Sequence, residues 1–326
     1  MSSQSNLSGR AVYVVDGNRT PFRKAKPTSP FLGSDLAVEA GIPLLKRQPF
    51  LPNCLDEVII GSAMPGPDEA NIARIVALRL GCGPKVPAFT VMRNCASGMQ
   101  ALDNAALQIA NGRSELILAG GTDAMSHAPL LFNQKMSIWL SQWALAKSFG
   151  QKAAVLTQFR PSFLAPIIAL LRGLTDPIVG LNMGQTAEEL AYKFHITREQ
   201  MDAFAAQSHL KLEKAYQEHH MSEVTPIIDY KGVVYSKDDG IRVDSTVEKL
   251  ASLKPFFDKK YGMVTAGNSS QITDGACLLL LASADAVKKY NLKVLGRIVD
   301  SQWSALDPSQ MGLGPVHAAT AIMQRQ

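Results

Sequence analysis

Short apolar runs alternate with amphipathic stretches over the first 123 residues of the chain. Brief apolar runs bounded by polar or turn residues predict strands. Such runs occupy residues 11–15, 58–60, 88–93 and 115–119. Two stretches between them, residues 34–47 and 70–81, carry apolar residues at helical spacing. The order strand, helix, strand, helix favours a mostly parallel sheet with helices on both faces.

The pattern changes between Ala124 and Thr175, where the chain has no Asp or Glu. Two Trp and several Phe occur there among many aliphatic residues. The basic residues of this segment are Lys135, Lys147, Lys152, Arg160 and Arg172. Because proline interrupts a helix, Pro161, Pro166 and Pro177 are expected to divide the segment into short helices. The composition indicates an insert that follows the first strands and helices.

Regular structure is expected to resume after the insert. A pair of helices with charged faces is predicted over residues 182–217, with Thr197 as an N-cap and Glu199 close behind it. The apolar run 276–283 predicts a strand and residues 284–291 a helix, after which another strand begins within 293–303. The expected fold class is therefore α/β.

Composition narrows the functional classes. With 326 residues, of which 46% are hydrophobic and 19% charged, the chain is long enough to bury a large core and is not typical of disorder. The net charge of +5 is too small and too scattered to indicate a nucleic-acid interface. The four cysteines form no C-x-x-C pair and have no His at ligand spacing, which argues against zinc. The first ten residues lack the apolar run of a secretory signal, so a reducing cytoplasm is expected.

Cys95 has the most distinctive setting of the four cysteines. It follows the strand expected over 88–93 and precedes a helix expected from Ser97. Open α/β sheets bind ligands at the carboxyl ends of their strands, and the positive end of a helix favours a thiolate. Gly98 leaves room for a substrate carbonyl beside backbone N–H donors. Spacing alone leaves two interpretations, a nucleophile or a small buried hydrophobe. The other cysteines, Cys54, Cys82 and Cys277, have no comparable setting and are interpreted as structural.

Five motifs occur in a fixed order along the chain: NCASGMQAL, AGGTDAMS, NMGQTAEELA, TAGNSSQITDGA and MGLGPV. Together they resemble the thiolases, the acyl-CoA:acetyl-CoA C-acyltransferases. The likeness runs through essentially the whole chain. The insert after AMSHAPLLF is most similar to that of the thiolase subunit of multienzyme fatty-acid β-oxidation complexes. Condensing ketosynthases share a cysteine nucleophile, but NCASGMQAL and TAGNSSQITDGA are more similar to the thiolase pattern.

The resemblance implies roles for five residues. Cys95 matches the nucleophile that takes the acyl group from a 3-ketoacyl-CoA, releases acetyl-CoA and passes the acyl group to coenzyme A. Ala266 and Ser270 match positions that line the pantetheine channel. Phe257 and Met183 match further wall residues of the coenzyme A site, with ordinary loop packing as the alternative. Coenzyme A is then a substrate, and neither a cofactor nor a metal is expected.

The resemblance also implies a duplicated α/β/α/β/α layered fold with a loop domain inserted in its first half. Residues 1–123 and 245–290 would form the N-terminal half, 124–244 the inserted loop domain, and 291–326 the start of a C-terminal half that is largely missing. Asn182 stands where many biosynthetic members have His, which fits the β-oxidation type.

Three further stretches of the thiolase pattern do not occur in the 326 residues. N-E-A-F-A supplies an Asn that holds a water, G-H-P supplies the His that activates the nucleophile, and C-x-G supplies a second Cys as acid and base. His317 lies outside the G-H-P position and is not expected to act as the missing base. We therefore expect a carboxyl-terminally truncated thiolase with little turnover by itself.

The expected partners are acyl-CoA and coenzyme A, a second copy in a homodimer, and the hydratase/dehydrogenase subunit of a β-oxidation complex. The basic and aromatic residues within 135–172 fit a peripheral membrane contact, whereas their apolar runs are too short to span a bilayer. A basic cover over an acyl tunnel is the alternative for this segment. The expected location is cytoplasmic, at the inner-membrane surface where the segment binds lipid. A non-catalytic, thiolase-derived membrane- or partner-binding subunit is the second functional hypothesis.

Overall fold

The computed structural model describes residues 7–326, which divide into two compact units. The first unit contains residues 7–127 together with Gly184–Gln326, and the second contains Ala128–Met183. The second unit includes nearly all of the acid-free segment. Residues 184–244, which the sequence analysis placed in the inserted loop domain, group with the first unit.

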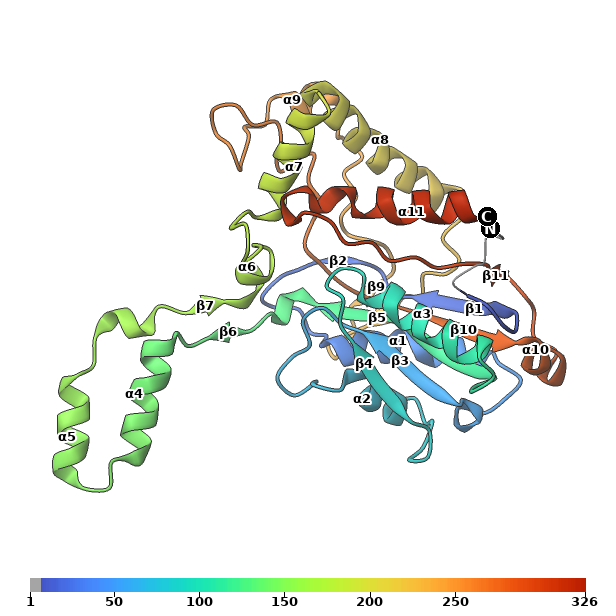
Figure 1. Ribbon diagram of the computed structural model, residues 1–326, viewed down its shortest axis with the longest axis horizontal. Coiled ribbons are helices and arrows are strands. Elements are labelled where there is room, and N and C mark those ends of the chain that lie inside the picture. Colours follow the sequence, from blue (N-terminus) through green and yellow to red (C-terminus); the bar gives the residue numbers. More distant parts are fainter. Residues whose placement is uncertain (1–6) are drawn as a thin grey trace. The chain divides into compact units, whose positions relative to one another are not determined.

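A seven-stranded sheet forms the centre of the first unit (Figure 1). Its strands are β1 (Val12–Arg19), β2 (Arg23–Lys24), β3 (Glu57–Gly61), β4 (Ala88–Val91), β5 (Leu116–Ala124), β10 (Thr273–Ser283) and β11 (Gly296–Ile298). They are arranged in the order β11-β1-β10-β5-β3-β4, and β2 pairs with one end of β10. Each strand expected from the sequence is present, with shifted ends.

The prediction of a mostly parallel sheet is wrong. β3 pairs in parallel with β4 and β5, but β10 is antiparallel to both β1 and β5, and β11 and β2 also pair antiparallel. The cause is β10, which enters the sheet after the insert and runs between the first strand and the last strand of the preceding α/β segment. The alternation of strands and helices along the chain did not indicate that β10 lies between β1 and β5.

Helices cover both faces of the sheet, as predicted. Helices α1 (Gly33–Lys46) and α2 (Ile72–Arg79) pack on one face, and α3 (Ser97–Ala110) packs on the other. Side chains of successive strand residues point to opposite faces. Ile60 and Leu118 accordingly belong to the cluster with α1 and α2, while Ile59 and Ile117 belong to the cluster with α3.

The remaining elements of the first unit follow the insert or connect the sheet strands. They are η1 (Pro52–Cys54), η2 (Met125–His127), α7 (Met183–Lys193), α8 (Arg198–Gln217), β8 (Ile227–Ile228), β9 (Val234–Tyr235), α9 (Val247–Ala251), α10 (Ala284–Tyr290), η4 (Pro308–Leu313) and α11 (Gly314–Arg325). Met183, the first residue of α7, lies on the boundary between the units. The predicted N-cap is confirmed: the Thr197 side chain accepts from the N–H of Gln200, whose side chain accepts from the N–H of Thr197.

The second unit consists of short helices joined by a two-stranded ribbon. Its elements are β6 (Leu130–Leu131), α4 (Gln134–Leu145), α5 (Phe149–Thr157), η3 (Pro161–Leu164), β7 (Ile167–Ile168) and α6 (Ala169–Gly173). The Trp139 ring lies 5.9 Å from that of Trp143 and 5.3 Å from that of Phe159, and its Nε1 donates to the carbonyl of Val155. Aromatic packing therefore holds α4 to α5, and the predicted division into short helices is confirmed.

Candidate functional site

Cys95 lies in the turn that joins β4 to α3. β4 ends at Val91, and α3 begins at Ser97, the position that the sequence analysis predicted. Asn94 has a positive φ of 45°, which turns the chain sharply just before the cysteine. The Cys95 side chain is exposed, which excludes its interpretation as a small buried hydrophobe. Its thiol is accessible to a ligand at the amino end of a 14-residue helix.

The buried Ser97 side chain closes this turn. Its Oγ accepts from the N–H of Arg93 at 2.8 Å and donates to the carbonyl of Asn94 at 2.6 Å. Ala96 is the N-cap residue of α3 and supplies no side-chain cap. Among residues 7–326, no hydrogen bond uses the N–H of Gly98 or Met99. These backbone donors at the helix start are therefore free to stabilise negative charge that develops near Cys95.

Glycines allow α3 to start directly on the sheet. A Cβ atom at Gly61 of β3 would lie 2.2 Å from the carbonyl of Ser97, and one at Gly121 of β5 would lie 3.1 Å from the Cα of Gly98. Side chains at these positions would push the helix away. The close approach fixes Cys95 at the carboxyl ends of the parallel strands, where α/β sheets bind their ligands.

Trp303 packs against the residues that flank Cys95. The Arg93 guanidinium lies 4.0 Å from the centre of the Trp303 ring, and Trp303 Nε1 donates to Asp103 of α3 at 2.8 Å. Ser301 donates to the same carboxylate at 2.6 Å. The segment that follows β11 is thereby attached to α3 beside the candidate nucleophile.

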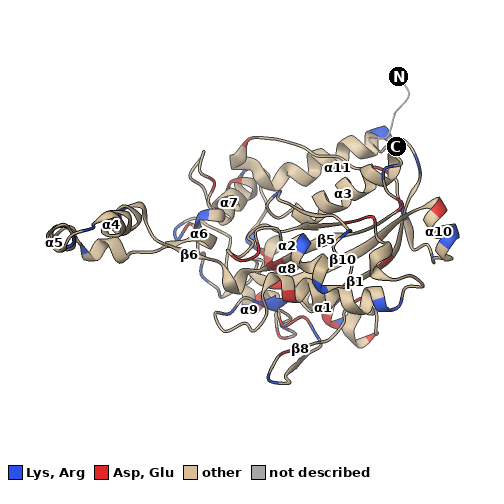
Figure 2. Ribbon diagram, turned by 90° about the horizontal axis from the view of Figure 1, so that it is seen from below, with Lys and Arg blue, Asp and Glu red and all other residues tan. Residues whose placement is uncertain are grey.

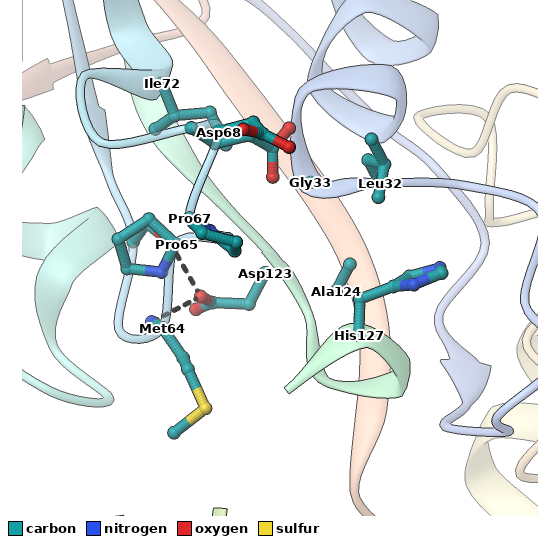
Figure 3. A pocket seen from close by; sticks show the side chains of 13 residues that line it. Leu32, Gly33, Met64, Pro65, Pro67, Asp68, Ile72, Asp123, Ala124 and His127 are labelled. Atoms are coloured by element: carbon teal, nitrogen blue, oxygen red, sulfur yellow. Dashed lines mark hydrogen bonds between the residues drawn. The ribbon is translucent and has the colours of Figure 1, made fainter. Parts of the chain in front are cut away.

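A pocket of about 220 Å³ lies at the same carboxyl edge of the sheet (Figure 3). Asp123, the second-last residue of β5, reaches into this pocket. Its carboxylate accepts hydrogen bonds from Ser62 Oγ and from the N–H groups of Ala63 and Met64 at 2.9–3.0 Å. Burial raises the pKa of Asp123, although these three hydrogen bonds lower it. This carboxylate lies in the AGGTDAMS motif but was not predicted from the sequence as a site residue. Its signal was an acidic residue near the end of an apolar strand.

Three of the predicted coenzyme A residues lie in one connected region of the first unit. Phe257 is half-buried and packs against Gly184 of α7, where a Cβ would lie 2.1 Å from the Phe257 ring. Ala266 and Ser270 are exposed in the loop that precedes β10. The N–H of Phe256 donates to the carbonyl of Val264, which joins the Phe257 segment to this loop.

Met183 belongs to the second unit, where its N–H donates to the carbonyl of Leu174. Its neighbour Asn182 forms an isolated bridge with Thr175 in the same unit. Within the described residues of the first unit, no hydrogen bond connects Cys95 to Phe257, Ala266 or Ser270. The binding roles of these three residues and of Met183 remain predictions.

Polar side chains that the sequence analysis did not identify hold the Ala266–Ser270 loop in place. Glu188 of α7 accepts from the N–H groups of Met263 and Val264 at 2.8–3.0 Å. Asn268 Nδ2 donates to Asp202 of α8 at 2.9 Å and to the carbonyl of Met263. Asp202 is fully buried and also receives the Arg198 guanidinium at 2.7 Å. The loop is thus attached to two helices through buried or partly buried carboxylates.

The other cysteines differ from Cys95 in burial or position. Burial raises the pKa of the Cys82 thiol to about 11 and also raises that of the Cys277 thiol. Cys54 is exposed, but it ends the 3-10 turn η1. In the described part of the chain, no group of three His, Cys, Asp or Glu side chains is arranged to hold a metal ion. His317 is exposed on α11.

Comparison with known proteins identifies the family. A family model described as "Thiolase, N-terminal domain" matches residues 12–285. The chain belongs to the thiolase family. The mitochondrial trifunctional enzyme subunit beta of Homo sapiens is 35% identical over 319 residues, which cover 97% of this chain and 66% of that protein. The 3-ketoacyl-CoA thiolase of Shewanella baltica is 33% identical, and the match covers 98% of this chain and 74% of that thiolase.

The fold comparison agrees with the sequence comparison. A crystal structure of human mitochondrial 3-ketoacyl-CoA thiolase in complex with CoA matches this thiolase chain with a TM-score of 0.84 and 35% sequence identity, covering 98% of this chain and 76% of that one. The chain spans 66% of the length of the trifunctional enzyme subunit beta. The likeness therefore extends over almost all of this thiolase chain but over only part of that relative.

Proposed function

We propose that this thiolase chain transfers acyl groups between coenzyme A thioesters through Cys95, as the 3-ketoacyl-CoA thiolase of fatty-acid β-oxidation. The observation that supports this proposal is the position of an exposed cysteine in a sharp turn at the start of α3, with unused backbone N–H groups one turn ahead. A thiol is a good nucleophile and leaving group, and backbone donors stabilise the oxyanion that forms when it attacks a carbonyl.

The proposed reaction has two steps. The Cys95 thiolate attacks the 3-keto carbon of a 3-ketoacyl-CoA, forming a C–S bond. The C2–C3 bond of the substrate then breaks, and C2 takes up a proton as acetyl-CoA leaves. In the second step the thiolate of a free coenzyme A attacks the Cys95 thioester, so that the shortened acyl-CoA leaves and the Cys95 thiolate is restored. Coenzyme A is a substrate in this scheme, and no cofactor takes part.

Ala266 and Ser270 are proposed to line the pantetheine channel, and Phe257 and Met183 are proposed as further wall residues of the coenzyme A site. The exposure of Ala266 and Ser270 supports the first part of this proposal, because a loop that is held by Glu188 and Asp202 presents both residues at the surface. A preorganised loop loses little conformational freedom on binding. The CoA complex of the human mitochondrial thiolase, which has the same fold, supports coenzyme A as the ligand class.

Protection from alkylation tests the proposed site. Cys54 and Cys95 are the exposed cysteines of the described chain, so iodoacetamide is expected to modify both. Desulfo-coenzyme A, which lacks the thiol that would consume iodoacetamide, should at saturating concentration slow modification of Cys95 by about tenfold or more. Modification of Cys54, which lies outside the proposed site, should be unaffected and serves as the internal control. A Cys95 modification rate that is the same with and without desulfo-coenzyme A would contradict the proposed binding site.

A homodimer is proposed as the working form. β4 lies at the edge of the described sheet, and an edge strand offers backbone groups for pairing with a second copy. Met92, just beyond β4, is 61% exposed and Met99 of α3 is 63% exposed, so apolar side chains surround this edge. Analytical ultracentrifugation should detect a dimer, and a species that stays monomeric at all concentrations would oppose the proposal.

The second unit is proposed to bind an anionic membrane surface or the hydratase/dehydrogenase subunit of a β-oxidation complex. Figure 2 shows Lys and Arg but no Asp or Glu on α4 and α5. Leu145 is 76% exposed and Phe149 89% exposed at the tip of this helix pair. Exposed apolar residues beside basic ones favour an interfacial contact with lipid. No helix in residues 7–326 has the length and apolar character needed to cross a bilayer.

Liposome co-sedimentation tests the lipid contact. Vesicles with anionic lipid should carry down the wild-type chain, and deletion of residues 135–172 should abolish sedimentation. Unchanged sedimentation of the deletion variant would leave the partner subunit as the proposed ligand. We propose a cytoplasmic location at the inner-membrane surface, which this lipid contact would provide.

A non-catalytic subunit remains the second candidate function. The exposed Leu145 and Phe149 beside the basic residues of α4 and α5 favour it, because such a surface suits attachment rather than catalysis. Formation of an acyl thioester at Cys95 distinguishes the two candidate functions, because a purely structural subunit forms none.

A further inference from the structure

A second pocket of the first unit, of about 450 Å³, carries a concentration of basic side chains. It lies between β2 with the loop that follows it and the hairpin of β8 and β9. Arg23, Lys24, Lys26 and Lys231 line it together with a single carboxylate, that of Asp229. Four cations and one anion leave the lining with a net charge of +3.

The guanidinium of Arg23 is held in place without a counter-ion. Its central carbon lies 3.6 Å from the centre of the Tyr235 ring and 5.9 Å from that of Phe31, so two aromatic rings fix its plane. The Nε and Nη1 atoms of Arg23 are buried and have no hydrogen-bond partner. In the described part of the chain, no carboxylate lies within salt-bridge distance of Arg23 or of the three lysines. A partly buried guanidinium with two unpartnered nitrogens is costly, and a bound anion would lower that cost.

Asp229 offsets one of these four positive charges but forms no salt bridge with them, because its oxygens accept hydrogen bonds inside the hairpin. Its Oδ1 accepts from the N–H groups of Lys231 and Val233 at 2.8 and 2.9 Å. Its Oδ2 accepts from the Tyr235 hydroxyl at 2.9 Å. The carboxylate therefore shapes the β8–β9 turn and orients the ring on which Arg23 stacks. The pocket is a rigid basic site rather than a set of unrelated surface lysines.

We propose that this pocket binds a phosphate-bearing anion. A planar guanidinium matches the geometry of phosphate oxygens, and the flexible ammonium groups around it add charge without fixing a shape. The volume is sufficient for a diphosphate group, and a net charge of +3 suits a multiply charged ligand better than a single carboxylate. None of the residues that line the pocket belongs to the β4–α3 turn that carries Cys95. The site is thus separate from the proposed acyl transfer.

Isothermal titration with inorganic pyrophosphate tests the proposal, at an ionic strength held constant with sodium chloride. The wild-type chain should show one saturable site. Arg23→Gln should weaken binding by about tenfold or more, because it removes a charged donor. Lys26→Gln should weaken it by a smaller factor of about two to five. Lys85→Gln removes an exposed charge outside the pocket and should bind as the wild type does.

A substitute variant, a competition experiment and a Cys95 control complete the test. If circular dichroism shows that Arg23→Gln is unfolded, the Lys26→Gln/Lys231→Gln double variant replaces it and should also weaken binding. If coenzyme A competes with pyrophosphate, the ligand of the pocket is the phosphate part of a coenzyme. If it does not compete, the ligand is a free phosphate compound. Cys95→Ala should bind pyrophosphate with unchanged affinity, so a failure of the acyl-transfer proposal is distinguishable. Absence of saturable binding by the wild type, or equal affinity of wild-type and pocket variants, would overturn the inference.

Discussion

At the scale of single residues, the first unit depends on charged groups that are buried in pairs. The Arg19 guanidinium donates to both carboxylate oxygens of Asp238 at 2.8 and 2.9 Å, and the N–H of Phe22 donates to the same carboxylate. The two side chains are 12% and 9% exposed. Burial alone would raise the pKa of Asp238, but the hydrogen bonds from Arg19 and Phe22 and the charge of Arg19 bring it below its usual value.

Asp238→Asn should therefore destabilise the fold in a pH-dependent way. The ionised carboxylate is the form that the fold stabilises, so its contribution is present above the unfolded pKa near 3.8 and is lost as pH falls through the lower folded value. At pH 7 the variant should lose about 3–5 kcal/mol of unfolding free energy, because the mostly buried Arg19 guanidinium loses its bidentate carboxylate partner and is left with the more distant Glu223 at 3.6 Å. Urea unfolding at several pH values measures this loss.

The exposed pair of Asp244 and Lys249 provides the control. The two side chains are 72% and 61% exposed, so Asp244→Asn should leave the free energy of unfolding nearly unchanged. A loss for Asp238→Asn that is as small as this control, or that stays constant from pH 7 down to pH 2, would show that the buried pair does not act as described.

At the scale of elements, the position of Cys95 depends on how closely α3 approaches the sheet. Gly61→Ala would place a methyl group 2.2 Å from the carbonyl carbon and the carbonyl oxygen of Ser97. Both are backbone atoms, so they cannot rotate away as a side chain could. The variant should lose about 3 kcal/mol of stability, the upper range for overpacking, and its Cys95 should lose reactivity as α3 shifts. Urea unfolding and the rate of Cys95 alkylation measure the two effects.

Gly150→Ala is the matched control for this change. Gly150 lies in α5 with no atom near its added Cβ and no positive φ, so alanine should be neutral or stabilising by up to about 1 kcal/mol. If Gly61→Ala left the free energy of unfolding and the rate of Cys95 alkylation unchanged, the close packing of α3 on β3 would be contradicted.

The helix start at Ser97 and the cap at Thr197 were predicted from the sequence, because apolar periodicity and capping residues act over a few positions. The antiparallel entry of β10 was missed, since its partners in β1 and β5 lie about 150 to 270 residues away in sequence. Pairing over such distances is decided by tertiary packing, which a local pattern does not encode.

The candidate site shows the same division. Cys95 and the AGGTDAMS and TAGNSSQITDGA segments were recognised from contiguous letters. Glu188 and Asp202 were missed, although they hold the Ala266–Ser270 loop, because each acts on a segment more than 60 residues further along the chain. Their sequence neighbourhoods are those of ordinary charged helix faces. The unpartnered guanidinium of Arg23 was missed for a related reason: the ring that stacks on it comes from the β8–β9 hairpin.

For the whole molecule, the proposed function requires that an acyl thioester forms at Cys95. The chain matches thiolases over 97–98% of its own length. The N-E-A-F-A, G-H-P and C-x-G stretches do not occur in it, and little steady-state turnover by the 326-residue chain alone stays a prediction. Formation of a single acyl adduct requires less than turnover does, since even slow attack by the Cys95 thiolate, without the His that a G-H-P stretch would supply, accumulates a thioester during a long incubation.

Intact-mass measurement and peptide mapping after incubation with a 3-ketoacyl-CoA test this claim most directly. We predict one acyl adduct per chain, on the peptide that contains Cys95, present in Cys54→Ala and lost in Cys95→Ala. An unmodified wild-type chain, or an adduct that persists in Cys95→Ala, would contradict the assignment of Cys95 as the acyl acceptor.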